Sequence, residues 1–201
     1  MHFDILEIAG TALGLLYLWL EYRASAWLWV VSIAMPAIYL AVYYRAGLYA
    51  DFAISVYYIL ASVYGLWAWL RSARLHQLSA PEANAGAGIS RTPRRVWLPM
   101  MAVGVAVFLV IGLILSRLTN STVPWADALT TALSIMAMWM LARKYLEQWL
   151  VWIVADLGCA ALYLYKGLDF TAGLYLLYAV VAALGYRRWQ QQMMKQTLTK
   201  Q

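Results

Sequence analysis

The chain has 201 residues, of which 65% are hydrophobic and 12% are charged, and its formal net charge is +6. A soluble protein of this size could not bury so much apolar surface, so the composition excludes a soluble fold and predicts an all-α protein in a lipid bilayer. The single cysteine excludes a disulfide framework, and both histidines lie outside the apolar segments, so no cofactor or metal is expected. The basic residues lie in loops and the tail, which disfavours nucleic acid as a partner.

Seven apolar segments are long enough to cross a membrane, and all are expected to be helices. In chain order they are Asp4–Leu20, Trp27–Tyr44, Tyr49–Leu70, Val96–Ser116, Val123–Leu141, Trp149–Tyr165 and Phe170–Tyr186. Residues 71–95 contain Pro, Gly and small residues without apolar periodicity, so they are predicted to form a flexible cytoplasmic linker. Residues 190–201 are predicted to form a cytoplasmic tail.

The basic residues are divided unequally between the two sides of this predicted bundle. Of the 15 Lys and Arg residues, twelve fall on the side of the C-terminus, and only Arg45, Arg117 and Lys166 fall on the other. Because cytoplasmic loops are enriched in Lys and Arg, the N-terminus is predicted to lie outside and the C-terminus in the cytoplasm. We expect a multi-pass protein of a bacterial cytoplasmic membrane.

The chain contains an internal duplication. Residues 11–69 align without a gap with residues 131–189, and 15 of the 59 paired positions are identical, against about five or six expected from so biased a composition. Four predicted spans separate the starts of the two copies, so the copies have the same orientation. The expected architecture is two parallel three-helix repeats (residues 4–70 and 123–189) joined by a connector helix (residues 96–116), which is typical of a transporter with its site between the repeats.

Polar and aromatic residues share faces of the inner predicted helices, since positions i, i+3, i+7 and i+14 of a helix lie on one side. The candidate substrate-binding residues of the second copy are Trp149, Trp152, Asp156, Tyr163, Tyr175 and Tyr178. Those of the first copy are Ser32, Asp51, Ser55 and Tyr58. The offset of 120 residues pairs Asp156 with Pro36.

Asp156 has the largest consequence, because an unpaired carboxylate in the middle of a membrane helix costs several kcal/mol or becomes protonated. It could lock helices together through hydroxyl or indole groups, bind a cationic or hydroxyl-rich ligand in a hydrated cavity, or relay a proton. An aromatic box with one carboxylate suits a flat cationic ring. Trp152 is expected to stack on such a ring, whereas Trp149, at the helix end, suits the interfacial aromatic belt. Asp51 suits either a helix-start dipole interaction or ligand contact.

Other classes of membrane protein lack their required residues in this chain. A retinal-binding receptor needs a lysine deep in its last span, and the nearest candidate, Lys166, lies in the preceding loop. An intramembrane aspartyl protease needs two facing carboxylates, and no Ser–His pair is available for acyl transfer. The chain is therefore not expected to be an enzyme. A channel lined by aromatic residues and assembly as a homo-oligomer both stay open.

Several motifs resemble PnuC-type vitamin transporters. In the first half they are the segments EYRASAWLW (21–29), GLYAD (47–51) and YYILASVYG (57–65). In the second half they are ARKYLEQWLVWIVAD (142–156), YKGL (165–168) and TAGLY (171–175). The resemblance covers nearly the whole chain apart from the linker, the connector helix and the tail.

This resemblance implies a fold like that of full-length SWEET sugar transporters, with three, one and three helices. It also implies uptake of nicotinamide riboside by facilitated diffusion, with phosphorylation in the cytoplasm trapping the substrate. Some members of the family carry thiamine instead. Both vitamins contain a permanently cationic ring and hydroxyl groups, which Asp156 and Trp152 suit.

Overall fold

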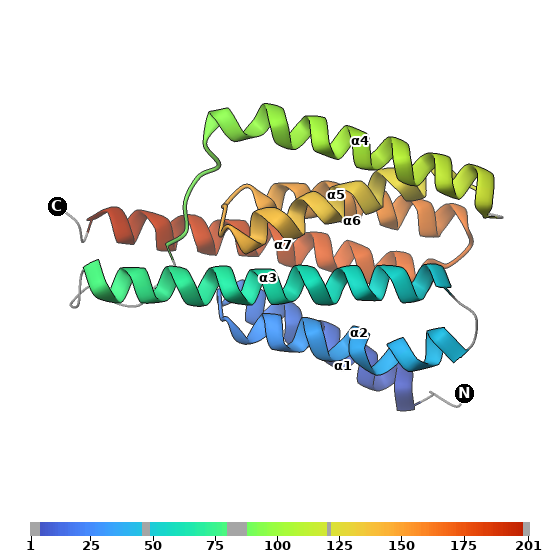
Figure 1. Ribbon diagram of the computed structural model, residues 1–201, viewed down its shortest axis with the longest axis horizontal. Coiled ribbons are helices and arrows are strands. Elements are labelled where there is room, and N and C mark those ends of the chain that lie inside the picture. The colour runs from blue at the N-terminus through green and yellow to red at the C-terminus, as the bar shows by residue number, and fades with distance from the viewer. Residues whose placement is uncertain (1–4, 46–48, 80–87, 120–121, 199–201) are drawn as a thin grey trace. The chain divides into compact units, whose positions relative to one another are not determined.

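The structure, a computed structural model, describes residues 5–45, 49–79, 88–119 and 122–198 (Figure 1). Within these ranges the chain forms α-helices joined by turns and extended segments. The helices are α1 (Ile5–Tyr22), α2 (Trp27–Arg45), α3 (Tyr49–Ser79), α4 (Arg94–Leu118), α5 (Pro124–Ala142), α6 (Gln148–Tyr165) and α7 (Asp169–Leu198). Each corresponds to one predicted segment and starts within two residues of the predicted position, so the all-helical class is confirmed.

Two helices extend far beyond their predicted ends. The helix α3 continues to Ser79 and α7 continues to Leu198, past the predicted ends at Leu70 and Tyr186. The hydropathy pattern marks where a helix leaves the hydrocarbon, whereas the backbone stays helical until a breaker residue appears. Residues 71–79 and 187–198 contain neither Pro nor Gly. The predicted flexible linker therefore begins as helix, and α7 extends into the predicted tail, whereas the cytoplasmic location of both segments stays a prediction.

Three helices in the described part of the chain are long and apolar enough to cross a membrane, namely α4, α5 and α6. The other helices contain 18 residues in α1, 19 in α2, 31 in α3 and 30 in α7. That these four also cross the membrane stays a prediction.

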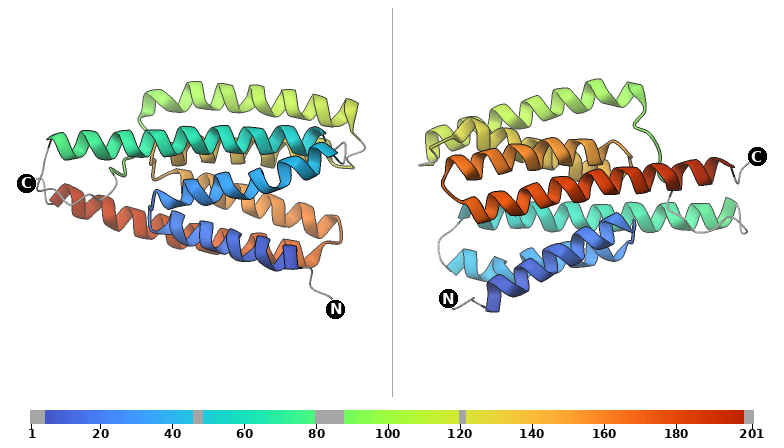
Figure 2. Two further views of the ribbon diagram at one scale, coloured as in Figure 1. Left: turned by 60° about the horizontal axis from the view of Figure 1, so that its bottom comes forward. Right: turned by 180° about the vertical axis from the view of Figure 1, so that it is seen from behind.

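The chain divides into two compact units, Met1–Gly88 and Ile89–Gln201. In the first unit α2 packs against α1 and α3. In the second, α5 packs against α4 and α6, and α6 and α7 lie side by side (Figure 2). The connector helix α4 thus belongs to the second unit, because its buried Gly104 and Gly112 leave room for the side chains of Met136 and Trp125 on α5.

The two units repeat the same local contacts at positions 120 residues apart. Ala24 and Lys144 both adopt left-handed backbone conformations, with φ of 52° and 56°, in the turn between the first two helices of each copy. Just before each turn an arginine covers a tryptophan ring, with Arg23 4.9 Å from the Trp19 centroid and its counterpart 5.3 Å from the Trp139 centroid. The duplication therefore extends from the sequence to the side-chain contacts within each unit.

A pair of tryptophans is also repeated. Trp29 and Trp69 meet edge to face with ring centroids 5.8 Å apart, and Trp149 and Trp189 do so at 5.5 Å. In each unit a glycine makes room for the first indole: a methyl group on Gly185 would lie 2.7 Å from the Trp149 ring. Gly65 faces Trp29 in the same way. These four rings are at most 3% exposed, so the pairs form the core of each unit.

The end of the predicted linker is held against the turn between α5 and α6. The Ser90 N–H donates to the Lys144 carbonyl at 3.1 Å, and the Leu146 N–H donates to the Ser90 carbonyl at 2.9 Å. The backbone N–H and the hydroxyl of Thr92 both donate to Glu147 Oε2 at 2.8 Å. Burial in this turn lowers the pKa of Lys144 to about 8. Residues 88–93 therefore form a tether rather than a flexible connection.

Replacing Glu147 with Ala should loosen this tether. The substitution removes the acceptor of both Thr92 hydrogen bonds, and losing a partner of a charged group costs about 1–3 kcal/mol. The peptide bond after the exposed Arg91 should then be cleaved by trypsin about tenfold faster or more. Glu147→Gln keeps an acceptor oxygen and is the control, expected to be cleaved at close to the wild-type rate. Equal cleavage of all three proteins would contradict the tether.

Candidate functional site

One face of α6 carries a continuous series of polar and aromatic side chains. Gln148, Trp152, Asp156, Cys159 and Tyr163 follow each other at spacings of three or four residues, so they lie on one side of the helix. Gln148 is fully buried and Asp156 is 7% exposed, whereas the other three are half-buried. A buried polar stripe in an apolar helix is costly unless it meets polar groups.

Two tyrosines of α7 supply part of that polar surface. The hydroxyls of Tyr175 and Tyr178 and the thiol of Cys159 lie within electrostatic range of the Asp156 carboxylate. All of these residues belong to the second unit, where α6 and α7 pack along their length. The structure thus places two of the predicted site residues, Tyr175 and Tyr178, near the predicted carboxylate of Asp156.

The tyrosines form an aromatic wall beside Asp156. Tyr163 and Tyr175 stack with ring centroids 5.2 Å apart and an interplanar angle of 18°, and their hydroxyls are within hydrogen-bonding reach. Tyr178 meets the Tyr175 ring edge to face at 5.6 Å. Because aromatic faces attract cations, this wall and the carboxylate together suit a positively charged ring.

An ion pair closes the same region at the end of α6. Lys166 Nζ donates to Asp127 Oδ1 at 2.8 Å and lies 5.9 Å from the centroid of the Tyr163 ring. On α5, one turn from Asp127, Thr130 lies within hydrogen-bonding reach of the Cys159 thiol. The site is therefore bounded by α5 as well as by α6 and α7.

The two tryptophans of α6 have different surroundings. Trp149 is 1% exposed and packs on Trp189 and Gly185, so its interpretation as a residue of the interfacial belt is wrong. Although Trp149 lies at the end of α6, its side chain faces α7 rather than lipid. Since Trp29 makes the same contacts in the first unit, we assign Trp149 a packing role, and its contact with substrate stays a prediction.

Two buried groups on the α6 face lack a hydrogen-bond partner among the described residues. They are the Gln148 amide, through both its oxygen and its nitrogen, and the indole nitrogen of Trp152. Leaving such groups unpaired costs about 1–3 kcal/mol each. They are therefore available to a ligand that carries hydroxyl or amide groups.

The predicted residues of the first unit form a separate set. Ser55 is 5% exposed, and Tyr58, on the same helix, is half-buried and accepts a 2.6 Å hydrogen bond from Ser62 at its backbone carbonyl. Ser32 Oγ donates to the Trp29 carbonyl at 3.1 Å, so its hydroxyl bonds to the backbone of its own helix. Asp51 lies in the first turn of α3, but its side chain lies outside the described residues.

Sequence reasoning missed several of these residues. Cys159 had been considered only for disulfides and metals, although its position three residues after Asp156 places it on the same face. Gln148 precedes Trp152 by four residues, a spacing that could have identified it. In the first unit, Glu21 is 1% exposed and within hydrogen-bonding reach of Tyr17, four residues earlier on α1. No group of three or more His, Cys, Asp or Glu side chains in the described chain is arranged to hold a metal ion.

Comparisons with known proteins extend over nearly the whole chain. Residues 4–191 match the model of the nicotinamide mononucleotide transporter family. The nicotinamide riboside transporter PnuC of Escherichia coli K12 is 23% identical over 201 residues, covering 92% of this chain and 84% of its own. The riboflavin/roseoflavin transporter RibM of Streptomyces davaonensis is 27% identical over 185 residues, covering 91% of this chain and 83% of its own.

A solved structure also resembles this chain. The crystal structure of the vitamin B3 transporter PnuC superimposes with a TM-score of 0.66 and 22% sequence identity, and covers 91% of this chain and 79% of that protein. The likeness establishes a common fold.

Proposed function

Because this chain belongs to the nicotinamide mononucleotide transporter family, we propose that it carries nicotinamide riboside, a form of vitamin B3, across the bacterial cytoplasmic membrane. Transport is facilitated diffusion, and phosphorylation of the riboside in the cytoplasm traps it there. The proposal involves no chemical conversion of the substrate by this protein. The PnuC relative, whose name specifies this substrate, supports the assignment.

The observation that carries the proposal is the buried carboxylate of Asp156 beside the tyrosine wall. The riboside contains a pyridinium ring with a permanent positive charge, which Asp156 balances while aromatic faces stack on the ring. The free amide of Gln148 and the indole N–H of Trp152 match its carboxamide and ribose hydroxyls. This assignment gives Asp156 the ligand-binding role among the three roles open to it.

The arrangement of the helices is part of the same proposal. Two parallel three-helix repeats, joined by the connector α4, rock about a shared interface and expose the site alternately to each side of the membrane. In this proposal Ser55, Tyr58 or Ser32 of the first repeat supplies a partner for the ribose hydroxyls. The distribution of Lys and Arg supports an external N-terminus and a cytoplasmic C-terminus.

Thiamine is the second candidate substrate, because its thiazolium ring is also a permanent cation and meets the same carboxylate. Riboflavin, which the RibM relative transports according to its name, has a neutral ring system. A neutral ring has no positive charge for the Asp156 carboxylate to balance, so riboflavin is the weaker candidate.

Charge should decide which ligands bind. In proteoliposomes, the purified protein should take up labelled nicotinamide riboside with saturation, and excess unlabelled riboside should compete. The dihydro form of the riboside has nearly the same shape but an uncharged ring, and it should compete at least about tenfold more weakly, the equivalent of one lost charge-assisted contact. Equal competition by the two forms would contradict a role for the cationic ring. Saturable uptake of thiamine alone would favour the second candidate.

A further inference from the structure

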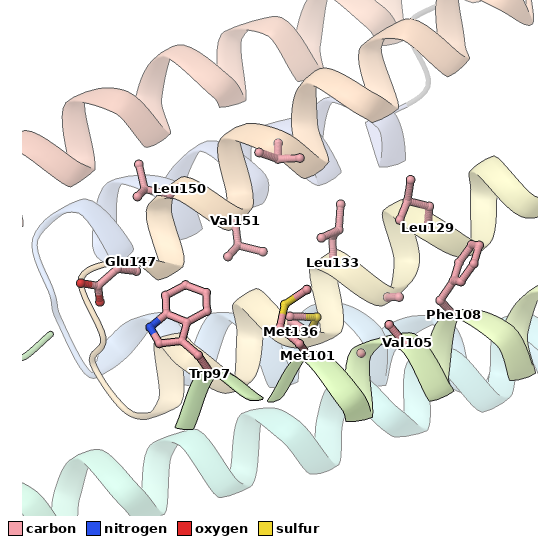
Figure 3. A pocket seen from close by; sticks show the side chains of 13 residues that line it. Trp97, Met101, Val105, Phe108, Leu129, Leu133, Met136, Glu147, Leu150 and Val151 are labelled. Atoms are coloured by element: carbon pink, nitrogen blue, oxygen red, sulfur yellow. The ribbon is translucent and has the colours of Figure 1, made fainter. Parts of the chain in front are cut away.

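A groove lies in the second unit, away from the polar face of α6. It is an open groove of about 300 Å³ between α4, α5 and α6. Its walls are almost wholly apolar, and Trp97, Met101, Val105 and Phe108 form the α4 side (Figure 3). The candidate substrate residues of α6 do not line it, so it is a separate site.

The groove has the length of one leaflet of hydrocarbon. Its α4 wall extends from Trp97 to Phe108, which at 1.5 Å per residue is about 16 Å. Half of a bilayer core of about 30 Å is about 15 Å. The three helices that form the groove are also the three that meet the length and hydropathy for crossing a membrane. An acyl chain of a single leaflet therefore fits along it.

One end of the groove, here called its polar end, has Glu147 as its charged lining residue and lies close in the sequence to several arginines. Figure 3 shows Trp97 and Glu147 at this end and Phe108 at the other. Arg94 precedes Trp97 by three residues, so it lies one turn beyond it on the same face of α4, and it is exposed. Arg91 and Arg95 are exposed nearby in the sequence. A guanidinium group binds phosphate through paired hydrogen bonds, and the arginines at positions 91, 94 and 95 outnumber the one carboxylate, Glu147, in this part of the structure.

From these observations we infer that the groove binds one phospholipid of the cytoplasmic leaflet. An acyl chain lies between α4, α5 and α6, and the headgroup phosphate contacts Arg94. The tryptophan at the polar end lies at headgroup depth, where indole rings are favoured. On α6, Val151 and Val154 line the groove, whereas Trp152 and Asp156 lie on the polar face of that helix. The lipid thus contacts the helix that carries the substrate site.

Photolabelling in vesicles tests the inference. The protein is reconstituted in phosphatidylethanolamine and phosphatidylglycerol vesicles that contain a trace of phosphatidylglycerol with a diazirine in its acyl chain, and labelled peptides are mapped by mass spectrometry. Labels should concentrate on the groove-lining residues of α4, α5 and α6. Val105→Trp should fill the groove and remove this labelling. Val103→Trp, which changes an exposed valine of the same helix outside the groove, should not.

The headgroup contact has its own test, which can be carried out even if Val105→Trp fails to fold. Arg94→Gln should lower labelling about tenfold, the effect of one lost charged contact, whereas Arg117→Gln at the other end of α4 should leave it unchanged. The inference is overturned if labels are spread evenly over the exposed faces of α4 and α7, or if Arg94→Gln and Arg117→Gln behave alike. It is also overturned if Val105→Trp changes the oligomeric mass and leaves lipid labelling intact, because the groove would then be a contact between copies.

Discussion

Replacing Asp156 with Ala should strongly reduce uptake of nicotinamide riboside at low substrate concentration while leaving the protein folded. The substitution removes the buried charge that balances the pyridinium ring. Contacts to a charged group contribute about 1.5–3 kcal/mol, so affinity should fall by about ten- to more than a hundredfold. Ligand-induced quenching of tryptophan fluorescence gives the affinity, and proteoliposome uptake gives the transport rate.

Two further variants separate charge from structure. Asp156→Asn keeps the size and hydrogen-bonding capacity of the side chain, so it should bind more weakly than wild type but more strongly than Asp156→Ala. Asp169→Asn changes an exposed carboxylate at the start of α7 and should transport normally. If Asp156→Ala binds the riboside with wild-type affinity, Asp156 only packs helices, and the assignment of the site fails.

The duplicated tryptophan cores should tolerate no added methyl group at their glycines. In Gly185→Ala the new Cβ would lie 2.7 Å from the Trp149 ring, closer than real contacts allow. Overpacking of this kind costs about 1–3 kcal/mol, so thermal unfolding in detergent should occur at a clearly lower temperature. Gly65→Ala should have a similar effect, because in the first unit Gly65 faces Trp29, the counterpart of Trp149.

Gly173 on α7 supplies the matched control. A Cβ there would meet no atom within 4 Å, and Gly in a helix interior is less stable than Ala by about 0.5–1 kcal/mol. Gly173→Ala should therefore unfold at the same or a slightly higher temperature. Combining Gly185→Ala with Trp149→Leu should recover part of the loss, since the smaller side chain makes room for the methyl group. Additive losses in the double variant would show that the two residues do not interact.

The sequence predicted most of the helical framework because hydropathy and the 120-residue offset are strong, local signals. The starts of all seven predicted helices agree with the described structure, and Ala24 and Lys144 show that the offset also locates the turns. The ends of α3 and α7 were misplaced because hydropathy reports contact with lipid, whereas helix formation continues in polar sequence.

The candidate site was harder to predict, because the sequence pattern of a helical face does not show which other helix packs on it. The stripe through Asp156 was identified, but its approach to Tyr175 depends on how α6 packs on α7. Trp149 was misjudged for the same reason, since a tryptophan at a helix end suits both lipid and a core. The hydrogen bonds between Thr92 and Glu147 join residues 55 positions apart and follow no periodic pattern, so the sequence did not predict them.

The two units share one scaffold but differ at its most polar position. Where the second unit carries Asp156, the first has Pro36 in α2, which can neither hold a charge nor donate a backbone hydrogen bond. Under the proposed function, a molecule with one cationic end should therefore bind in a single orientation, with its charge at Asp156 rather than at Pro36. The halves are free to diverge in specificity at such positions, since the tryptophan pairs that hold each bundle together lie elsewhere.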